Sequence, residues 1–257
     1  MNRVVVSVAW VGMMFLAGCS GGSTAPANSS GSATSSATAS TTAATGGTSA
    51  TPSTSSTGTD QIGGGAYASS ALTPADLPAG YAVQQITAEQ DLAGLNNQLA
   101  QVRVTPSPKC FTLGPLTADT AKTGLLTLFV NSATRETIAE FVAPAGNPPL
   151  AAIASDAAGC GQYTVADPAK GVRETGAIQM VPTPPVTAEK TLGLKTTTVT
   201  TTAGEPPVTT VQIDYLAETR GTLVTINTKG GPTGAPIAPA VVATAFTKAV
   251  NNVNTRH

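Results

Sequence analysis

The C-terminal half of the chain contains three successive stretches that are typical of strands, and the second and third alternate apolar and polar positions. Residues 192–202 and 208–217 are rich in Thr and Val and are joined by Gly204-Glu205-Pro206-Pro207, and Gly221 separates the second stretch from residues 222–228. β-Branched residues favour extended backbone, and short connections of this composition join antiparallel neighbours. The pattern therefore predicts an antiparallel meander with one face packed and the other exposed to water.

Apolar residues at spacings of three and four predict helices beside this sheet. Thr73-Pro74-Ala75-Asp76 has the N-cap, proline and acid of one capped turn, and residues 88–99 have one apolar side. Residues 149–160 are Ala-rich and are also expected to be helical. A final helix should cover the sheet with an apolar stripe that consists of Ile237, Val241, Val242, Ala245, Phe246, Ala249, Val250 and Val253. Helices and an antiparallel sheet together predict an α+β domain.

The middle of the chain contains short apolar runs. We expect a buried strand over residues 125–130 and a further strand starting at residue 162. Between them we expect a helix over residues 135–141, with Ile138, Phe141 and Val142 inward. Pro144 should end that helix, because proline lacks the N–H that a helix needs.

The N-terminus carries an export signal. Arg3 precedes an apolar run over residues 4–15, which is shorter than the roughly 20 apolar residues that a membrane-spanning helix needs. The motif Leu16-Ala17-Gly18-Cys19 resembles the lipobox of bacterial lipoproteins. The resemblance implies that a signal peptidase recognises Leu16, Ala17 and Gly18, and that Cys19 becomes the lipidated N-terminus. The alternative is an ordinary cleaved signal peptide that a cysteine follows by chance.

A low-complexity segment follows Cys19. Residues 20–59 are, apart from Asn28, only Ser, Thr, Ala, Gly and Pro, and such a segment cannot offset its chain entropy by burial. We expect a signal peptide over residues 1–18, a lipidated disordered linker over 19–65 with a reach of about 35 Å, and one globular domain over 66–257. The threonine clusters of the linker are either acceptors for O-linked sugar or plain linker.

The charge of the chain does not indicate nucleic-acid binding. Residues 60–257 carry 14 acidic and 12 basic residues, and phosphate binding requires clustered Lys and Arg. We therefore expect no nucleic-acid partner. The expected partner is the membrane, which the lipid anchor on Cys19 would enter. The expected location is the outer side of the cell membrane.

Two cysteines remain after lipidation. Cys110 and Cys160 form an even pair in an exported chain, which predicts a disulfide. The alternative is two free thiols, one of them catalytic. A catalytic thiolate needs a base, however, and the only histidine is the terminal His257.

Residues for catalysis are few. The only histidine is the terminal His257, and a frayed end does not suit a Ser-His-Asp, Cys-His or His-based zinc site, so we expect none of them. No Lys has a Ser three positions before it. We expect no metal and no cofactor. Glu136 and Glu140 lie one turn apart on the expected helix, either as a catalytic pair or as a solvated helix face, and Asp214 is either catalytic or solvent-facing.

Several features together resemble the envelope lipoproteins of mycobacteria and related actinobacteria. They are Leu16-Ala17-Gly18-Cys19, the Ser/Thr/Ala linker, the stretch Leu72-Thr73-Pro74-Ala75-Asp76-Leu77-Pro78-Ala79-Gly80-Tyr81, two later cysteines and a C-terminal amphipathic helix. The resemblance implies a single α+β domain, similar in some members to the extracellular sensor domain of PknH-type Ser/Thr kinases.

Three functions follow as hypotheses. The first is a non-enzymatic binding or sensor module for an envelope lipid, a glycan or a protein partner. The second is a carboxylate-based hydrolase of cell-wall glycan, and the third is a structural or secretion-accessory lipoprotein. The Leu-, Val- and Ala-rich elements either enclose an apolar ligand pocket or form a packed core.

Overall fold

A computed structural model describes residues 65–84 and 86–256, which include a nine-stranded antiparallel sheet. The strands lie in the order β1-β3-β4-β9-β8-β7-β6-β5-β2. Their bounds are β1 (Tyr81–Gln84), β2 (Arg103–Thr105), β3 (Leu125–Asn131), β4 (Thr137–Pro144), β5 (Tyr163–Asp167), β6 (Val172–Val181), β7 (Lys190–Thr202), β8 (Val208–Thr219) and β9 (Thr222–Lys229).

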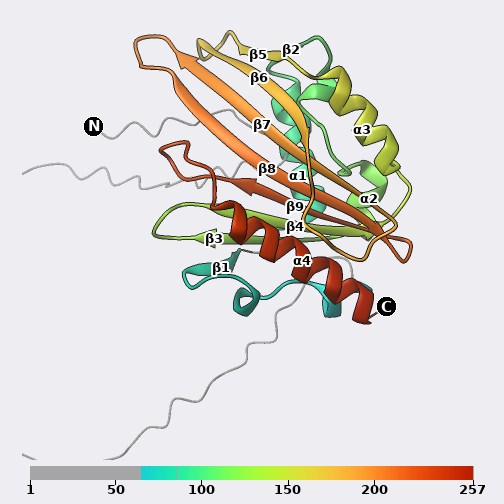
Figure 1. Ribbon diagram of the computed structural model, residues 1–257. Helices are drawn as coiled ribbons and strands as arrows, with labels where there is room; N and C mark the ends of the chain where they lie inside the picture. Colours follow the sequence, from blue (N-terminus) through green and yellow to red (C-terminus); the bar gives the residue numbers. More distant parts are fainter. Residues whose placement is uncertain (1–64, 85, 257) are drawn as a thin grey trace, which may run out of the picture. The chain divides into compact units, whose positions relative to one another are not determined.

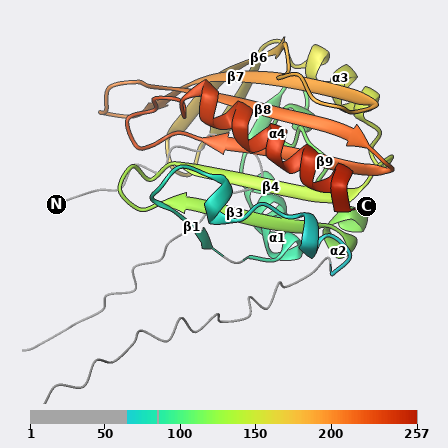
Figure 2. The ribbon, with the colours of Figure 1, turned by 60° about the horizontal axis from the view of Figure 1, so that its bottom comes forward.

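Helices lie on both faces of this sheet. They are α1 (Ala88–Leu99), α2 (Ala118–Thr123), α3 (Leu150–Gly159) and α4 (Pro239–Arg256), with single 3-10 turns η1 (Ala68–Ser70), η2 (Pro74–Asp76) and η3 (Pro108–Cys110). Helix α4 lies across β8 and β9 on one face, here called the α4 face (Figures 1 and 2). Helices α1, α2 and α3 cover the other face, here called the α3 face (Figure 1).

Strand register assigns each side chain to one of these faces, because successive residues of a strand point to opposite sides. Glu140 pairs with Ile226, which pairs with Tyr215, and this row points to the α4 face. Phe246 of α4 packs there, with its ring centroid 5.3 Å from that of Tyr215. Leu216 belongs to the opposite row and packs in the core beneath α3.

A tight turn fixes the β8–β9 pairing. Arg220 and Gly221 have φ values of +51° and +70°, and they separate the directly paired Thr219 and Thr222. Two central residues with positive φ are the mark of the type I′ turn, whose twist matches that of a hairpin. Gly221 adopts this conformation without a steric cost, since it has no Cβ.

The α+β class and the antiparallel meander over β7, β8 and β9 are confirmed. So are the capped turn at η2, the helices α1, α3 and α4, and the strands β3 and β5. Of the expected apolar stripe on α4, Val242, Ala245, Phe246, Ala249, Val250 and Val253 are buried.

Two expectations are wrong, one about the helix over residues 135–141 and one about the exposed face of the meander. Residues 137–144 form strand β4 rather than a helix, because a central strand buried on both faces has apolar residues at both parities and imitates helical spacing. The meander also does not leave a whole face to water: residues 222–226 of β9 are all buried between α4 and the α3 side. None of the helices in residues 65–84 and 86–256 is long and apolar enough to cross a membrane.

Candidate functional site

One part of the sheet has no helix above it. Helix α4 lies over β8 and β9, so the same face of β6, β7 and the outer half of β8 is uncovered (Figures 1 and 2). The register places eleven exposed or half-exposed side chains there, and we call them the open face. They are Arg173, Thr175, Ala177 and Gln179 of β6, Lys195, Thr197, Val199 and Thr201 of β7, and Thr209, Val211 and Ile213 of β8.

The open face combines hydroxyl groups, methyl groups and two positive charges. Its four threonines and Gln179 can donate and accept hydrogen bonds, and Arg173 and Lys195 stand near its two ends. None of the eleven residues is acidic. Because strands lie about 4.8 Å apart and same-face residues repeat about every 6.7 Å, these groups form a regular flat array.

The opposite side of these strands and of the neighbouring β9 carries a buried polar row. Its members are at most 3% exposed, although all are polar: Glu174, Thr196, Thr198, Thr200, Gln212, Asp214 and Thr225. Thr198 and Thr210 share a hydrogen bond across β7 and β8. Buried polar side chains without partners are costly, so this row needs partners on the α3 face.

Tyr163 covers one end of the row by lying over a glycine. A Cβ on Gly176 would be 2.2 Å from Cζ of Tyr163, so only glycine leaves room for the ring. The Tyr163 hydroxyl donates to Glu174 at 3.5 Å, and the Thr200 hydroxyl donates to the other carboxyl oxygen at 3.5 Å. Burial raises the pKa of Glu174 to about 8, against these two hydrogen bonds, which lower it.

A small cavity lies at the other end of the row. Its volume is about 10 Å³, and its walls are Leu113, Gly114, Pro115, Ile153, Leu194, Thr196, Asp214, Leu216, Thr225 and Asn227. A space of this size holds about one water molecule. An apolar ligand of the expected kind therefore does not fit this cavity.

Asp214 is the charged group of the cavity. The Thr228 backbone N–H donates to its Oδ1 at 3.1 Å. Burial raises the pKa of Asp214 to about 7, while the hydrogen bonds from Thr228 and Asn227 lower it. The hydroxyl of Thr225 and Oε1 of Gln212 are buried without a hydrogen-bond partner in the described part of the chain.

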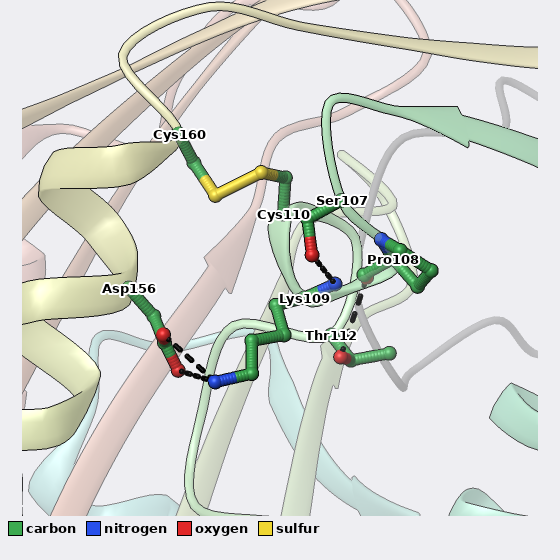
Figure 3. Close-up of a disulfide and its surroundings, with 7 residues drawn as sticks. All are labelled: Ser107, Pro108, Lys109, Cys110, Thr112, Asp156 and Cys160. Atoms are coloured by element: carbon green, nitrogen blue, oxygen red, sulfur yellow. Dashed lines mark hydrogen bonds and ion pairs between the residues drawn. A yellow bond between two sulfur atoms is a disulfide. The ribbon is translucent and has the colours of Figure 1, made fainter.

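A disulfide fixes the segment that roofs this cavity. Cys110 at the end of η3 is bonded to Cys160 directly after α3, with Cα atoms 5.3 Å apart, as the sequence predicted (Figure 3). Lys109 adds an ion pair to Asp156 of α3, with Nζ 3.0 Å from Oδ1 (Figure 3). Residues 113–115 follow η3 within five positions, so both links hold them near α3.

Glu136 and Glu140 do not lie one turn apart on a helix, because residues 137–144 form strand β4. Both belong to an extended segment, where four residues span about 13 Å, beyond the roughly 9.5 Å that separates glycosidase carboxyls. Glu136 accepts a hydrogen bond from the Tyr81 hydroxyl at 2.9 Å. Glu140 accepts one from the Leu72 backbone N–H at 2.8 Å, and burial raises its pKa to about 8.

Other sequence-predicted residues fall into three groups. Leu16, Ala17, Gly18 and Cys19 lie outside the described residues, as does His257. Asp214 is buried on the α3 face rather than facing solvent. No cluster of three or more His, Cys, Asp or Glu that could hold a metal occurs within residues 65–84 and 86–256.

The open face and the cavity were not found by sequence reasoning. Strand β7 reads Lys195-Thr196-Thr197-Thr198-Val199-Thr200-Thr201-Thr202, with threonine at both parities. The polarity pattern therefore does not distinguish the buried side from the exposed one. A comparison with protein-family models, curated proteins and solved structures found no match.

Proposed function

We propose that this chain is a lipid-anchored binding module of the cell envelope that holds an acidic glycan on the open face and catalyses no reaction. The observation that carries this proposal is the open face itself, an uncovered sheet surface with eleven side chains and no carboxylate. The lipobox-like motif ending at Cys19 supports the anchor, and a linker with the expected reach of about 35 Å would let the domain meet the wall beyond the membrane.

The chemistry of the open face favours a glycan over the other partners. Threonine hydroxyls match the donors and acceptors of sugar hydroxyl groups, and threonine and valine methyl groups match the apolar patches of sugar rings. Arg173 and Lys195 are suited to carboxylate or phosphate groups on the glycan, since charge-assisted hydrogen bonds are stronger than neutral ones. A protein partner usually finds larger anchors, such as Trp and Tyr, which this face lacks.

The buried carboxyl groups support a role without catalysis. Glu140 holds the backbone of Leu72, and Glu218 accepts from the first N–H of α3 at 2.8 Å and from Lys190 at 2.8 Å. These are structural contacts inside the domain. The hydrolase hypothesis rested on Glu136 and Glu140, whose positions on one extended segment do not suit that chemistry.

The test is binding to glycan isolated from the envelope of the producing organism. The full chain with Cys19→Ser, which removes the lipid attachment, should co-sediment with acidic wall glycan, and the double variant Arg173→Glu/Lys195→Glu should bind at least tenfold more weakly. Lys122→Glu on α2, an exposed lysine on the other side of the sheet, is the matched control and should bind as before. Equal binding by all three proteins would refute the proposal.

Two further outcomes identify the rival partners. Binding to vesicles that contain anionic lipid, but not to the glycan, would assign the open face to the membrane surface. Cross-linking in cells that returns one stoichiometric protein would favour the accessory lipoprotein. In either case the charge reversals on the open face show whether this surface makes the contact.

A further inference from the structure

Three strands and two covering segments bound the cavity on the α3 face. Strands β7, β8 and β9 form its floor, while residues 113–115 and Ile153 of α3 form its roof. Its volume of about 10 Å³ admits one particle of the size of a water molecule. The occupant is therefore a single water or a single ion.

The polar groups that line this cavity mainly contribute oxygen atoms, which can coordinate a cation. Asp214 contributes a carboxylate, Thr196 and Thr225 contribute hydroxyls, and Asn227 contributes an amide. Thr225 is 0% exposed and its Oγ1 has no hydrogen-bond partner in the described residues. Gln212, which lies opposite Thr196 in the sheet, leaves its own Oε1 unpartnered as well.

The charge balance of the site favours a cation over water. Asp214 is 3% exposed, and no lysine or arginine is among the residues that line the cavity. Burial raises the pKa of Asp214 to about 7, against the hydrogen bonds from Thr228 and Asn227, which favour the charged form, so near neutral pH the carboxyl exists in both forms. The charged form, buried without a counter-charge, is strongly unfavourable, and a cation in the cavity would supply that counter-charge in place of a proton.

One carboxylate among neutral oxygens specifies the charge of this cation. A divalent ion would leave one positive charge uncompensated in an enclosed site, whereas a monovalent ion leaves none. Carboxylate, hydroxyl and amide oxygens are ligands of hard cations. A softer metal would require sulfur or imidazole, and the cavity has neither.

We infer that this cavity is a binding site for one hard monovalent cation of the size of sodium, held by Asp214, Thr225 and Thr196. The ion would join β7, β8 and β9 under the segment that the Cys110–Cys160 disulfide holds. This inference is independent of the proposed function, because the open face lies on the other side of the sheet.

The test measures thermal unfolding of the full chain with Cys19→Ser as sodium replaces choline at constant chloride concentration. A ligand that binds only the folded state raises the midpoint with its concentration, so above half-saturation each tenfold increase in sodium should raise it by about 3 °C. Equal midpoints in sodium and choline would overturn the inference. A larger rise with calcium than with sodium would overturn the monovalent assignment.

Two variants locate the effect. Thr225→Val keeps the shape of the side chain and removes the hydroxyl, so the sodium-dependent rise should fall to less than a third. Thr209→Val removes an exposed hydroxyl on the open face and should keep the full rise. An unchanged rise in Thr225→Val would contradict the site. If that variant does not fold, the sodium-23 NMR signal of a solution of the wild-type protein decides. Binding to the protein should broaden this signal, and a signal as narrow as that of the same buffer without protein would contradict the site.

Discussion

Glu140 gives the sharpest prediction about the stability of this domain. It is 1% exposed, and burial raises its pKa from 4.5 to about 8, with a smaller contribution of the same sign from Asp76. Between pH 4.5 and about 8, the Glu140 carboxyl therefore keeps its proton in the folded chain and loses it in the unfolded chain. This contribution to the free energy of unfolding is fully present below pH 4.5 and is lost as the pH rises through about 8.

The magnitude follows from the pKa difference. Each unit is worth about 1.4 kcal/mol, and with pKa values of 4.5 and about 8 the loss between pH 5 and pH 8 amounts to roughly 2.6 units, or at most about 3.5 kcal/mol. Glu140→Gln keeps the shape, still accepts from the Leu72 N–H and does not titrate. The free energy of unfolding of the variant, minus that of the wild type, should therefore rise by up to about 3.5 kcal/mol from pH 5 to pH 8.

Urea denaturation at several pH values measures this difference. Asp91, Glu174 and Asp214 also have raised pKa values because of burial, but they titrate in both proteins and cancel. Glu205→Gln in the exposed turn between β7 and β8 is the matched control, and its difference from wild type should stay constant with pH. A constant difference for Glu140→Gln as well would refute the reasoning.

Three other changes should lower stability in urea. Gly176→Ala places a methyl group against the ring of Tyr163 and should cost about 1–3 kcal/mol; a cost below 0.5 would mean that the ring moves freely. Phe246→Ala, at a position that is 0% exposed, should cost about 3–5 kcal/mol, and a cost similar to that of the surface change Lys122→Ala would contradict the packing of α4. Replacing both Cys110 and Cys160 by Ser opens a loop with a sequence separation of 50 and should cost about 4 kcal/mol, and a reducing agent should then have no further effect.

The sequence predicted the fold best where one periodicity dominates. Helices α1, α3 and α4 have a clear apolar side, and the β7–β9 meander has turns marked by glycine and proline. The prediction for strand β4 was wrong because this strand lies between β3 and β9 with helices on both faces of the sheet, so the residues at both of its parities are apolar. Its Ile138 and Phe141 then lie at helical spacing while they point to opposite faces.

The candidate sites were harder to predict because they depend on which face is covered. Asp214 and Ile213 are neighbours in the chain, yet one lines an enclosed cavity and the other lies on the open face. The difference arises because α3 and residues 113–115 cover the side on which Asp214 lies, whereas on the other side α4 covers β8 and β9 but not β6 and β7. The Cys110–Cys160 disulfide was predictable because exported chains with an even number of cysteines pair them.

The most direct test of the central claim is the affinity of the open face for envelope glycan at increasing salt. The full chain with Cys19→Ser should bind acidic wall glycan, weaken as sodium chloride rises, and lose at least tenfold in affinity in Arg173→Glu/Lys195→Glu. Binding that is equally strong in the double variant and in Lys122→Glu, or no binding to any envelope glycan, would contradict the account.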